Sequence, residues 1–461
     1  MNSATADAAS LLLNASSLHN DAHFLRAVTG MADSQEVVAD SAIYSESGIK
    51  LLDKGGRIDS RLYEQLIQHR LATSIDEQLS TRNAVDRACL EAQVLLLSGS
   101  TPLGQLLAQH MGEHHHLLLE ALRHLKWPQP ASFKMTVMRH QMPELFEHSV
   151  LMMMVAVFLG VQQGMEPAEC ADLAAAALLH DVGMLYMPPN WLNPRHKLTP
   201  QEHRQLAAHS ITAMLVVQGA KVYPQAVADA VLEHHERLDG SGYPRHTKGD
   251  EVGPWGRILM LAEVVSAFYS KFSDMPAQRL SLMLRMNHSR FDAALTQHVF
   301  ALLTLAVPAA ATAVTHTSAE VREVIATLGA VFQHWTVCKR KFPSQWQALP
   351  GGRAGVYVDL RMQALEKSLA ESGSHPRQQA DWLRMFEEDP SSMGELVLIN
   401  KEALWQVNNC IEACVRRWPQ LLQPRTTFDA AMHDWLQSCR TVLGHAALPA
   451  AVTAVTADAA I

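Results

Sequence analysis

Two short stretches decide how this chain is interpreted: HDVG at residues 180–183 and HHERLDGSGYP at residues 234–244. Each begins with side chains that bind metal ions, His180 with Asp181 in the first stretch and His234 with His235 in the second. Adjacent ligands suit a site with more than one metal, because neighbouring side chains can diverge toward different ions. Together the two stretches predict a multinuclear metal centre.

Further ligand candidates lie within predicted helices. Glu144 and His148 are four residues apart, so on a helix they share one face and can reach one ion. His209 is expected midway along the following helix, and Glu263 in the last helix of the region. Five helices would thus offer ligands inward, as in metal sites of helical bundles. Imidazole and carboxylate suit iron, manganese or zinc, and the absence of cysteine ligands argues against a structural zinc site.

Chance must be weighed, because the chain has 24 histidines. The run His114–His116, with His110 and His124, is expected to be a solvated helix face, with adventitious metal binding as the alternative. His148 or His209 alone would be an ordinary, partly buried histidine. The complete set beside the glycine-rich turn favours a metal centre of the kind that hydrolyses phosphate esters.

Composition limits the classes of protein. A chain of 461 residues predicts two or three domains, and 48% hydrophobic residues suffice for sizeable cores. The net charge of −8 argues against sequence-independent binding of a nucleic-acid polymer, which needs a basic surface. It leaves room for a local basic pocket that takes a small phosphorylated ligand.

A cytoplasmic location is expected. The six cysteines are scattered without a CxxC framework, which indicates free thiols in a reducing compartment. Cys410 and Cys414 lie one helical turn apart, which indicates packing, with a metal or redox role as the alternative. No basic start precedes the leucines at 11–13, so no signal peptide is expected. The apolar runs at 149–160 and 300–314 are shorter than the ~20 residues that span a bilayer, so no membrane span is expected.

The pattern of apolar residues predicts a mainly α chain in four parts. A loosely ordered lead-in is expected over 1–40, and a small mixed and then helical module over 41–130, with a strand near 47–52 and a helix over 61–72. Pro128 and Pro130 mark a boundary. Residues 131–305 form a helical domain, and 306–461 add helices without a chemical motif. Helices are expected over 144–159, 168–180, from Thr199 onward, 225–236 and 257–272.

Over 131–305 the chain resembles the HD-GYP domain, a bacterial branch of the HD metal-dependent phosphohydrolases. His180-Asp181, His234-His235-Glu236 and the Gly242-Tyr243-Pro244 turn carry this resemblance. It implies an HD-type helical bundle that hydrolyses cyclic di-GMP to linear pGpG or GMP, with two or three divalent ions, iron first and manganese second. It also implies His180 and Asp181 as catalytic residues, within a set of metal ligands formed by Glu144, His148, His180, Asp181, His209, His234, His235 and Glu263. The signature loop that borders the substrate pocket comprises Asp239, Gly240, Gly242, Tyr243 and Pro244.

This sequence departs from the family pattern at three points. The usual lysine four residues after the motif histidine is Met184, and the usual aspartate at the last ligand position is Glu263. The family's Asp-Ala-Leu-Thr-like stretch and its following basic residues are blurred at 266–270. The first and third changes weaken phosphate binding. Arg257, Arg245 and Lys248 are the basic residues that could compensate, and Arg257 is included among the expected substrate-binding residues.

The expected mechanism is in-line attack on phosphorus by water that two ions ~3.5–4 Å apart activate, with Asp181 bridging the ions. Losing the lysine costs on the order of 10²–10³ in rate. A domain of another class, catalytically weak or inactive, that senses cyclic di-GMP or docks signalling proteins is the alternative. Hydrolysis of a different phosphate ester is a third interpretation. Residues 306–461 could form a homodimer, bind a signalling partner or be a plain helical extension.

Overall fold

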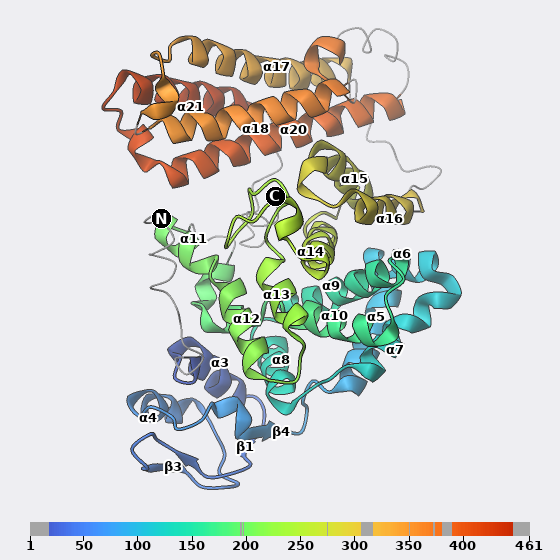
Figure 1. The fold of residues 1–461 in the computed structure, drawn as a ribbon, viewed down its shortest axis with the longest axis vertical. Helices are drawn as coiled ribbons and strands as arrows, with labels where there is room; N and C mark the ends of the chain where they lie inside the picture. The colour runs from blue at the N-terminus through green and yellow to red at the C-terminus, as the bar shows by residue number, and fades with distance from the viewer. Residues whose placement is uncertain are drawn as a thin grey trace. The chain divides into compact units, whose positions relative to one another are not determined.

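The computed structural model describes residues 18–193, 196, 198–273, 275–305, 317–349, 351–371, 374–379 and 390–445. These residues divide into two units (Figure 1). Unit 1 comprises residues up to 273 together with 289–305, and unit 2 comprises 275–288 together with 317–445. Each unit is built largely of helices, which confirms the prediction of a mainly α chain.

The apolar run near residue 150 forms the central helix of unit 1, α9 (Pro143–Gln162). Pro143 stands at its first turn, where the missing N–H costs nothing. Among the described residues, α9 is the one helix long and apolar enough to cross a membrane, longer than the apolar run suggested. Its hydrophobic window is 83% buried inside the protein, so α9 serves as a core helix.

Helix α10 (Pro167–Leu179) packs directly on α9. Its run of alanines at 174–177 favours helix formation and keeps the packed face flat. The helix α14 (Pro254–Lys271) packs on α9 as well. The other helices of the unit are α5 (Arg87–Ser100), α6 (Pro102–Met111), α7 (His116–His124), α8 (Gln129–Gln141), α11 (Pro200–Leu206), α12 (His209–Gly219), α13 (Gln225–Glu233) and α16 (Ala293–Thr304), with short 3₁₀ turns η3 (Gly112–His115), η4 (Val182–Tyr186), η5 (Pro189–Leu192) and η6 (Gly249–Glu251).

The first part of unit 1 is a small module with two antiparallel strand pairs. Strand β1 (Val37–Ala39) pairs with β4 (Leu79–Thr81), and β2 (Ile43–Tyr44) pairs with β3 (Lys50–Leu52). The module also contains α3 (Ala22–Ala32), η1 (Ser60–Leu62), α4 (Tyr63–Gln68) and η2 (Ile75–Glu77). The lead-in expected over 1–40 is therefore too long, because Asp21 caps α3 and its apolar face is buried; residues 1–17 lie outside the described part.

Unit 2 has a separate hydrophobic core between four long helices, which lie side by side in Figure 1. They are α17 (Ser318–Arg340), α18 (Gly352–Glu371), α20 (Pro390–Arg417) and α21 (Thr427–His445), with the turns η8 (Trp346–Ala348) and η9 (Pro419–Leu422). Helix α15 (Pro276–Met286) belongs to the same unit, because Met286 lies in this core and Leu282 packs against it. The sequence had placed α15 within the 131–305 domain. The 3₁₀ turn η7 (His288–Arg290) returns the chain to unit 1.

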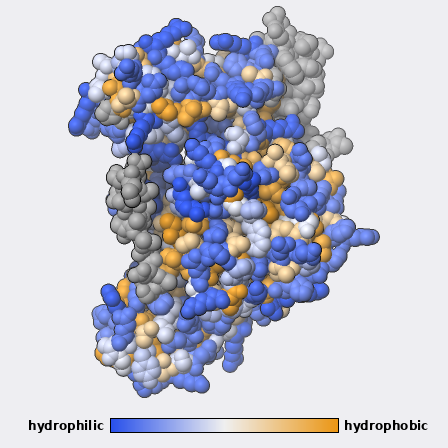
Figure 2. Space-filling view, viewed as in Figure 1, coloured by the Kyte–Doolittle hydropathy of each residue, from blue (hydrophilic) through white to orange (hydrophobic). Residues whose placement is uncertain are grey.

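The visible face of the protein is mainly hydrophilic, with scattered hydrophobic patches (Figure 2). Among the described residues, Leu95 and Leu96 are neighbours on α5 that are both more than half exposed. An exposed apolar pair of this size is normal on protein surfaces.

Candidate metal centre

Five helices of unit 1 carry the candidate ligands to one buried place. His180 is the C-terminal cap of α10 with Asp181 next to it, and His234 and His235 follow the last turn of α13. His148 lies on α9 and Glu263 on α14. His209 is the first residue of α12, not the middle of a helix, because the preceding helix α11 already ends at Leu206.

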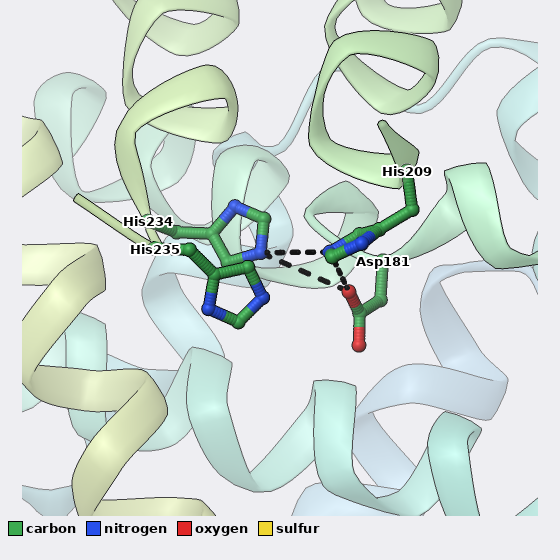
Figure 3. A group of neighbouring side chains, drawn as sticks. All are labelled: Asp181, His209, His234 and His235. Carbon is green, nitrogen blue, oxygen red and sulfur yellow. Dashed lines mark hydrogen bonds and ion pairs between the residues drawn. The ribbon is translucent and has the colours of Figure 1, made fainter. Parts of the chain in front are cut away.

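The first group of ligands consists of Asp181, His209, His234 and His235 (Figure 3). One potential ligand atom of each lies within 4.8 Å of the others. The Nε2 atom of His209 is 3.1 Å from Oδ1 of Asp181 and 3.4 Å from Nε2 of His234. All four side chains are buried, so the donors converge where little water can compete.

The second group consists of His148, His180 and Glu263. The Nε2 atom of His148 is 2.8 Å from Oε2 of Glu263, and Nε2 of His180 is 3.4 Å from the same oxygen. Glu263 is completely buried, and its longer side chain still reaches both histidines. The departure from aspartate at this position therefore leaves a carboxylate in the cluster.

Asp181 joins the two groups. Its Oδ1 faces His209, while its Oδ2 lies 3.2 Å from Nε2 of His180. A carboxylate with one oxygen toward each group has the arrangement that a bridging ligand needs.

Backbone carbonyls fix the orientation of three histidine rings. The Nδ1 atom of His180 is 2.8 Å from the carbonyl oxygen of Ala177. His209 and His234 make the same contact with the carbonyl three residues earlier, at 2.7 Å and 2.5 Å. With Nδ1 as the donor, Nε2 is left as the free acceptor that points into the cluster. This local helix-end geometry prepares the rings as ligands.

The donors fit a divalent cation. The Nε2 atom of His180, Nδ1 of His235 and Oε1 of Glu263 are buried without a hydrogen-bond partner. Buried polar atoms are normally satisfied, so three polar atoms left without a partner in one cluster indicate a site for a cation. Nitrogen and carboxylate oxygen are the donors that iron, manganese and zinc accept.

The charges of the cluster follow from its burial. Burial opposes ionisation of Asp181, but His180 and His209 hold the pKa of its carboxyl well below the usual range. Burial likewise opposes ionisation of Glu263, and His148 and His180 lower its pKa. Burial also opposes the charged form of His180, yet Asp181 and Glu263 raise its pKa to about 10. Without metal, two carboxylates thus face a protonated His180.

His234 and His235 behave in the opposite way. Burial and the neighbouring histidines His180 and His209 lower the pKa of His234 to about 3. Burial and the adjacent His234 lower the pKa of His235 as well. Both rings are therefore neutral near pH 7, which is the form that binds metal.

The glycine-rich loop folds back onto the end of α13. A Cβ atom on Gly242 would lie 2.4 Å from the backbone of Glu236, so only glycine allows this approach. The N–H of Tyr243 donates to the carbonyl of His235 at 3.1 Å. The ring of Tyr243 stacks on the ring of His235 with centroids 4.7 Å apart. Tyr243 thereby borders the first ligand group, and Pro244 follows it through a cis peptide bond.

The other residues that were expected to bind substrate make contacts within the glycine-rich loop or with the segments beside it. Asp239 accepts from the N–H of Ser241 at 2.8 Å and lies 3.4 Å from the guanidinium of Arg290. Gly240 has a positive φ of 76°, beside the side chain of Lys248. Arg257 contacts Asp250, Asp292 and two loop carbonyls, so its guanidinium is engaged by protein groups.

Four residues that the sequence singles out add neither a ligand nor a positive charge to the cluster. Glu144 is exposed at the start of α9 and belongs to neither ligand group. Met184 is buried beside the His-Asp pair and carries no charge. Arg245 forms an ion pair with Glu233, and Lys248 is exposed. None of these side chains supplies a positive charge from within the two groups.

Sequence reasoning missed two buried carboxylates that support the loop. Glu236 accepts from the N–H groups of Arg245 and Thr247 at 2.7 and 3.1 Å. Glu233 accepts from the N–H of Gly253 at 2.9 Å. The signal was present, since Glu236 stands inside the HHERLDGSGYP stretch, but a glutamate there is equally consistent with a surface residue.

Comparison with known proteins agrees with this geometry. A family model described as HD domain matches residues 121–295. The matched part of the chain is thus similar to HD domains. The match begins before the boundary expected near residue 130 and contains all the candidate ligands. The resemblance to HD-GYP proteins is confirmed at the level of the family.

Several curated relatives carry related sequences. A probable cyclic di-GMP phosphodiesterase of Vibrio cholerae is 35% identical over 99 residues, which cover 20% of this chain and 22% of that protein. A 3′3′-cGAMP-specific phosphodiesterase of the same organism is 32% identical over 123 residues, 26% of this chain and 28% of the relative. A cyclic di-GMP phosphodiesterase response regulator of Xanthomonas campestris is 33% identical over 117 residues, 25% of this chain and 31% of the relative.

The chain thus matches less than a third of the length of these relatives. Among solved structures, an HDG"Y"P protein from Bdellovibrio bacteriovorus is similar at 17% identity and a TM-score of 0.33, covering 59% of this chain and 94% of that one.

Proposed function

We propose that the HD domain of this chain is a metal-dependent phosphodiesterase that hydrolyses a cyclic dinucleotide, with cyclic di-GMP as the first candidate substrate. The observation that carries the proposal is the pair of buried ligand groups joined by the carboxylate of Asp181. Such an arrangement suits chemistry that needs ions on both sides of one reacting phosphate.

Each of the two groups of residues would hold its own ion. Asp181, His209, His234 and His235 would hold one ion, and His148, His180 and Glu263 another, with Asp181 shared. When bound, two or three divalent ions, iron first and manganese second, would supply a Lewis acid and lower the pKa of the attacking water. Tyr243, stacked on His235, borders the first group and would limit how a substrate approaches it.

The substrate class is supported by the names of the relatives. Those reported above are described as phosphodiesterases of cyclic di-GMP or of 3′3′-cGAMP. Both molecules are cyclic dinucleotides with two phosphodiester bonds, so the shared chemistry is cleavage of one such bond. Linear pGpG, or GMP after a second cleavage, would be the product from cyclic di-GMP.

A second function is favoured by one observation. Met184 is buried and uncharged where the family usually has lysine, and Arg257 and Arg245 pair with carboxylates of the protein. A transition state that loses one fixed charge forms on the order of 10²–10³ more slowly. A domain that binds a cyclic dinucleotide and docks signalling partners, without fast turnover, is therefore the alternative.

Single-turnover hydrolysis separates the two functions. The protein would be purified anaerobically, loaded with Fe²⁺ or Mn²⁺ and mixed with cyclic di-GMP or 3′3′-cGAMP. Asp181→Ala removes the shared carboxylate, and Asp229→Ala is the matched control, because Asp229 is exposed on α13. Turnover by the wild type and the control, lost in Asp181→Ala, is the expected result. Binding of the dinucleotide without turnover would move the assignment to the sensor.

A further inference from the structure

The turn η4, which follows Asp181, packs against a helix that lies far away in the sequence, α3. All five residues of η4 are buried, although η4 is only a short 3₁₀ turn. Its last residue, Tyr186, stacks on Phe24 of α3 with ring centroids 4.9 Å apart and planes 20° apart. Phe24 is itself completely buried. A helix of the N-terminal module, defined here as residues 18–81, therefore contacts the ligand-bearing segment directly.

A buried ion pair stands next to this stack. The ammonium of Lys134, on α8, lies 5.5 Å from the ring centroid of Phe24 and pairs with Asp76 of η2. The hydroxyl of Ser74 also donates to Asp76. Burial, Asp76 and Asp21 raise the pKa of Tyr186, which places the tyrosine near both carboxylates. Breaking a buried pair strands a charge in the core, so this arrangement resists displacement.

The opposite side of η4 is fixed by the ligand helices. A Cβ atom on Gly183 would lie 2.1 Å from the carbonyl oxygen of His209, so the turn packs against the start of α12. Because η4 packs on α3, α8 and α12, its position depends on both the module and a ligand helix.

The module is tied firmly to the HD domain. The side-chain amide of Gln129, on α8, donates to the carbonyl of Leu79 in β4, and both η2 and β4 pack on α8. Asn20 accepts from the N–H of Leu71 at 2.6 Å inside the module. A displacement of α3 would therefore be transmitted to η4 and not absorbed by a loose hinge.

We infer that Phe24 and Tyr186 are positioning residues of the metal centre: the N-terminal module holds η4 in place through their stack and thereby sets the geometry of His180 and Asp181. The inference rests on the proposed function in one respect, that these two residues bind metal. It gives the module a defined role, since a change in the module alters metal affinity without touching a ligand.

The test uses the full chain and three variants. Phe24→Leu removes the stacked ring but keeps an apolar side chain, and Tyr186→Phe keeps the ring and removes only the hydroxyl. Phe428→Leu is the matched control, because Phe428 is a buried phenylalanine in the core of unit 2. Hydrogen exchange is measured on metal-free protein at the amides of Met184 and Met187, which donate to Asp181 and Met184. The affinity of each variant for Mn²⁺ is then measured by competition with a chelator.

The expected result is specific to the stack. Phe24→Leu should speed exchange at both amides and weaken Mn²⁺ binding about tenfold, the low end of the effect of outer residues on metal affinity. Tyr186→Phe and Phe428→Leu should match the wild type in both measurements. Equal exchange and equal affinity in the two leucine variants would overturn the inference, as would a Tyr186→Phe variant that behaves like Phe24→Leu. The exchange measurement needs no metal and no turnover, so the inference and the proposed function can fail separately.

Discussion

At the scale of single residues, the centre depends on the backbone at the ends of helices. His180, His209 and His234 each hold a ring nitrogen against the carbonyl three residues earlier, which only a residue at a fixed place on a helical turn can do. The HD and HH pairs themselves could be predicted from the sequence, because adjacent metal-binding residue types stand near a glycine-rich turn. Glu144 shows the limit, because its spacing from His148 placed both on one helix face, yet Glu144 is exposed.

Gly183 provides a prediction at this scale. Gly183→Ala would place a Cβ atom 2.1 Å from the carbonyl oxygen of His209, so η4 and α12 must separate. We expect a loss of about 1–3 kcal/mol in the free energy of unfolding and a lower metal content, measured by denaturant titration and elemental analysis.

Gly99 is the control for that substitution. It is exposed on α5 and nothing lies within 4 Å of its Cβ position. Gly99→Ala should stabilise the protein by about 0.5–1 kcal/mol through helix propensity. Equal effects of the two substitutions would show that the close contact at Gly183 does not constrain the fold.

At the scale of elements, the loop of residues 239–247 is held in place by a buried carboxylate beneath it. Glu236 is completely buried and accepts from two backbone N–H groups of that loop. The helices on either side could be predicted from apolar periodicity, but the loop could not, because its conformation follows from tertiary hydrogen bonds. The Tyr243–His235 stack is a product of that network.

The substitution Glu236→Gln should loosen this loop. The new side chain would keep one acceptor oxygen and put an amide donor opposite a backbone N–H, so we expect a loss of about 1–3 kcal/mol in the free energy of unfolding. The expected kinetic effect is a higher KM for the dinucleotide, because Tyr243 would no longer be fixed. Glu147→Gln, an exposed change on α9, is the control. An unchanged stability and KM in the Glu236→Gln variant would remove Glu236 from the support of the loop.

At the scale of the whole molecule, the chain forms two units with separate cores. The mainly α fold and the similarity to HD domains could be predicted from periodicity and motifs. The assignment of α15 to unit 2 could not be predicted, because the sequence of an amphipathic helix shows that one face is buried but not which core buries it. The expected cytoplasmic location stays a prediction, as do a homodimer and a signalling partner for residues 306–461.

The reactivity of the buried cysteines measures how well the cores of the two units exclude solvent. Burial raises the pKa of the thiols of Cys338 and Cys439 to about 12, both in unit 2, and that of Cys170 in unit 1 to about 11. At pH 8, a thiol reagent should therefore label half-buried Cys89 first and the five buried cysteines only after unfolding. Labelling followed by peptide mass spectrometry measures this order.

The sign of the pH effect follows from the same shifts. Unfolded thiols ionise near pH 9, whereas the folded thiols keep their protons to higher pH. Their contribution to stability is thus fully present below pH 9 and is lost as the pH rises toward 12. Rapid labelling of Cys338 or Cys439 in the native protein would contradict the burial of this core.

If Asp181 joins two metal-binding groups, the number of ions that the chain holds must reflect it. Protein loaded anaerobically with Mn²⁺ would be freed of excess metal and its content measured, with electron paramagnetic resonance to detect coupled ions. We expect at least two ions per chain and magnetic coupling in the wild type and in Asp229→Ala, and loss of both in Asp181→Ala. Wild-type protein that retains no metal, or an Asp181→Ala variant that keeps a coupled pair, would contradict it.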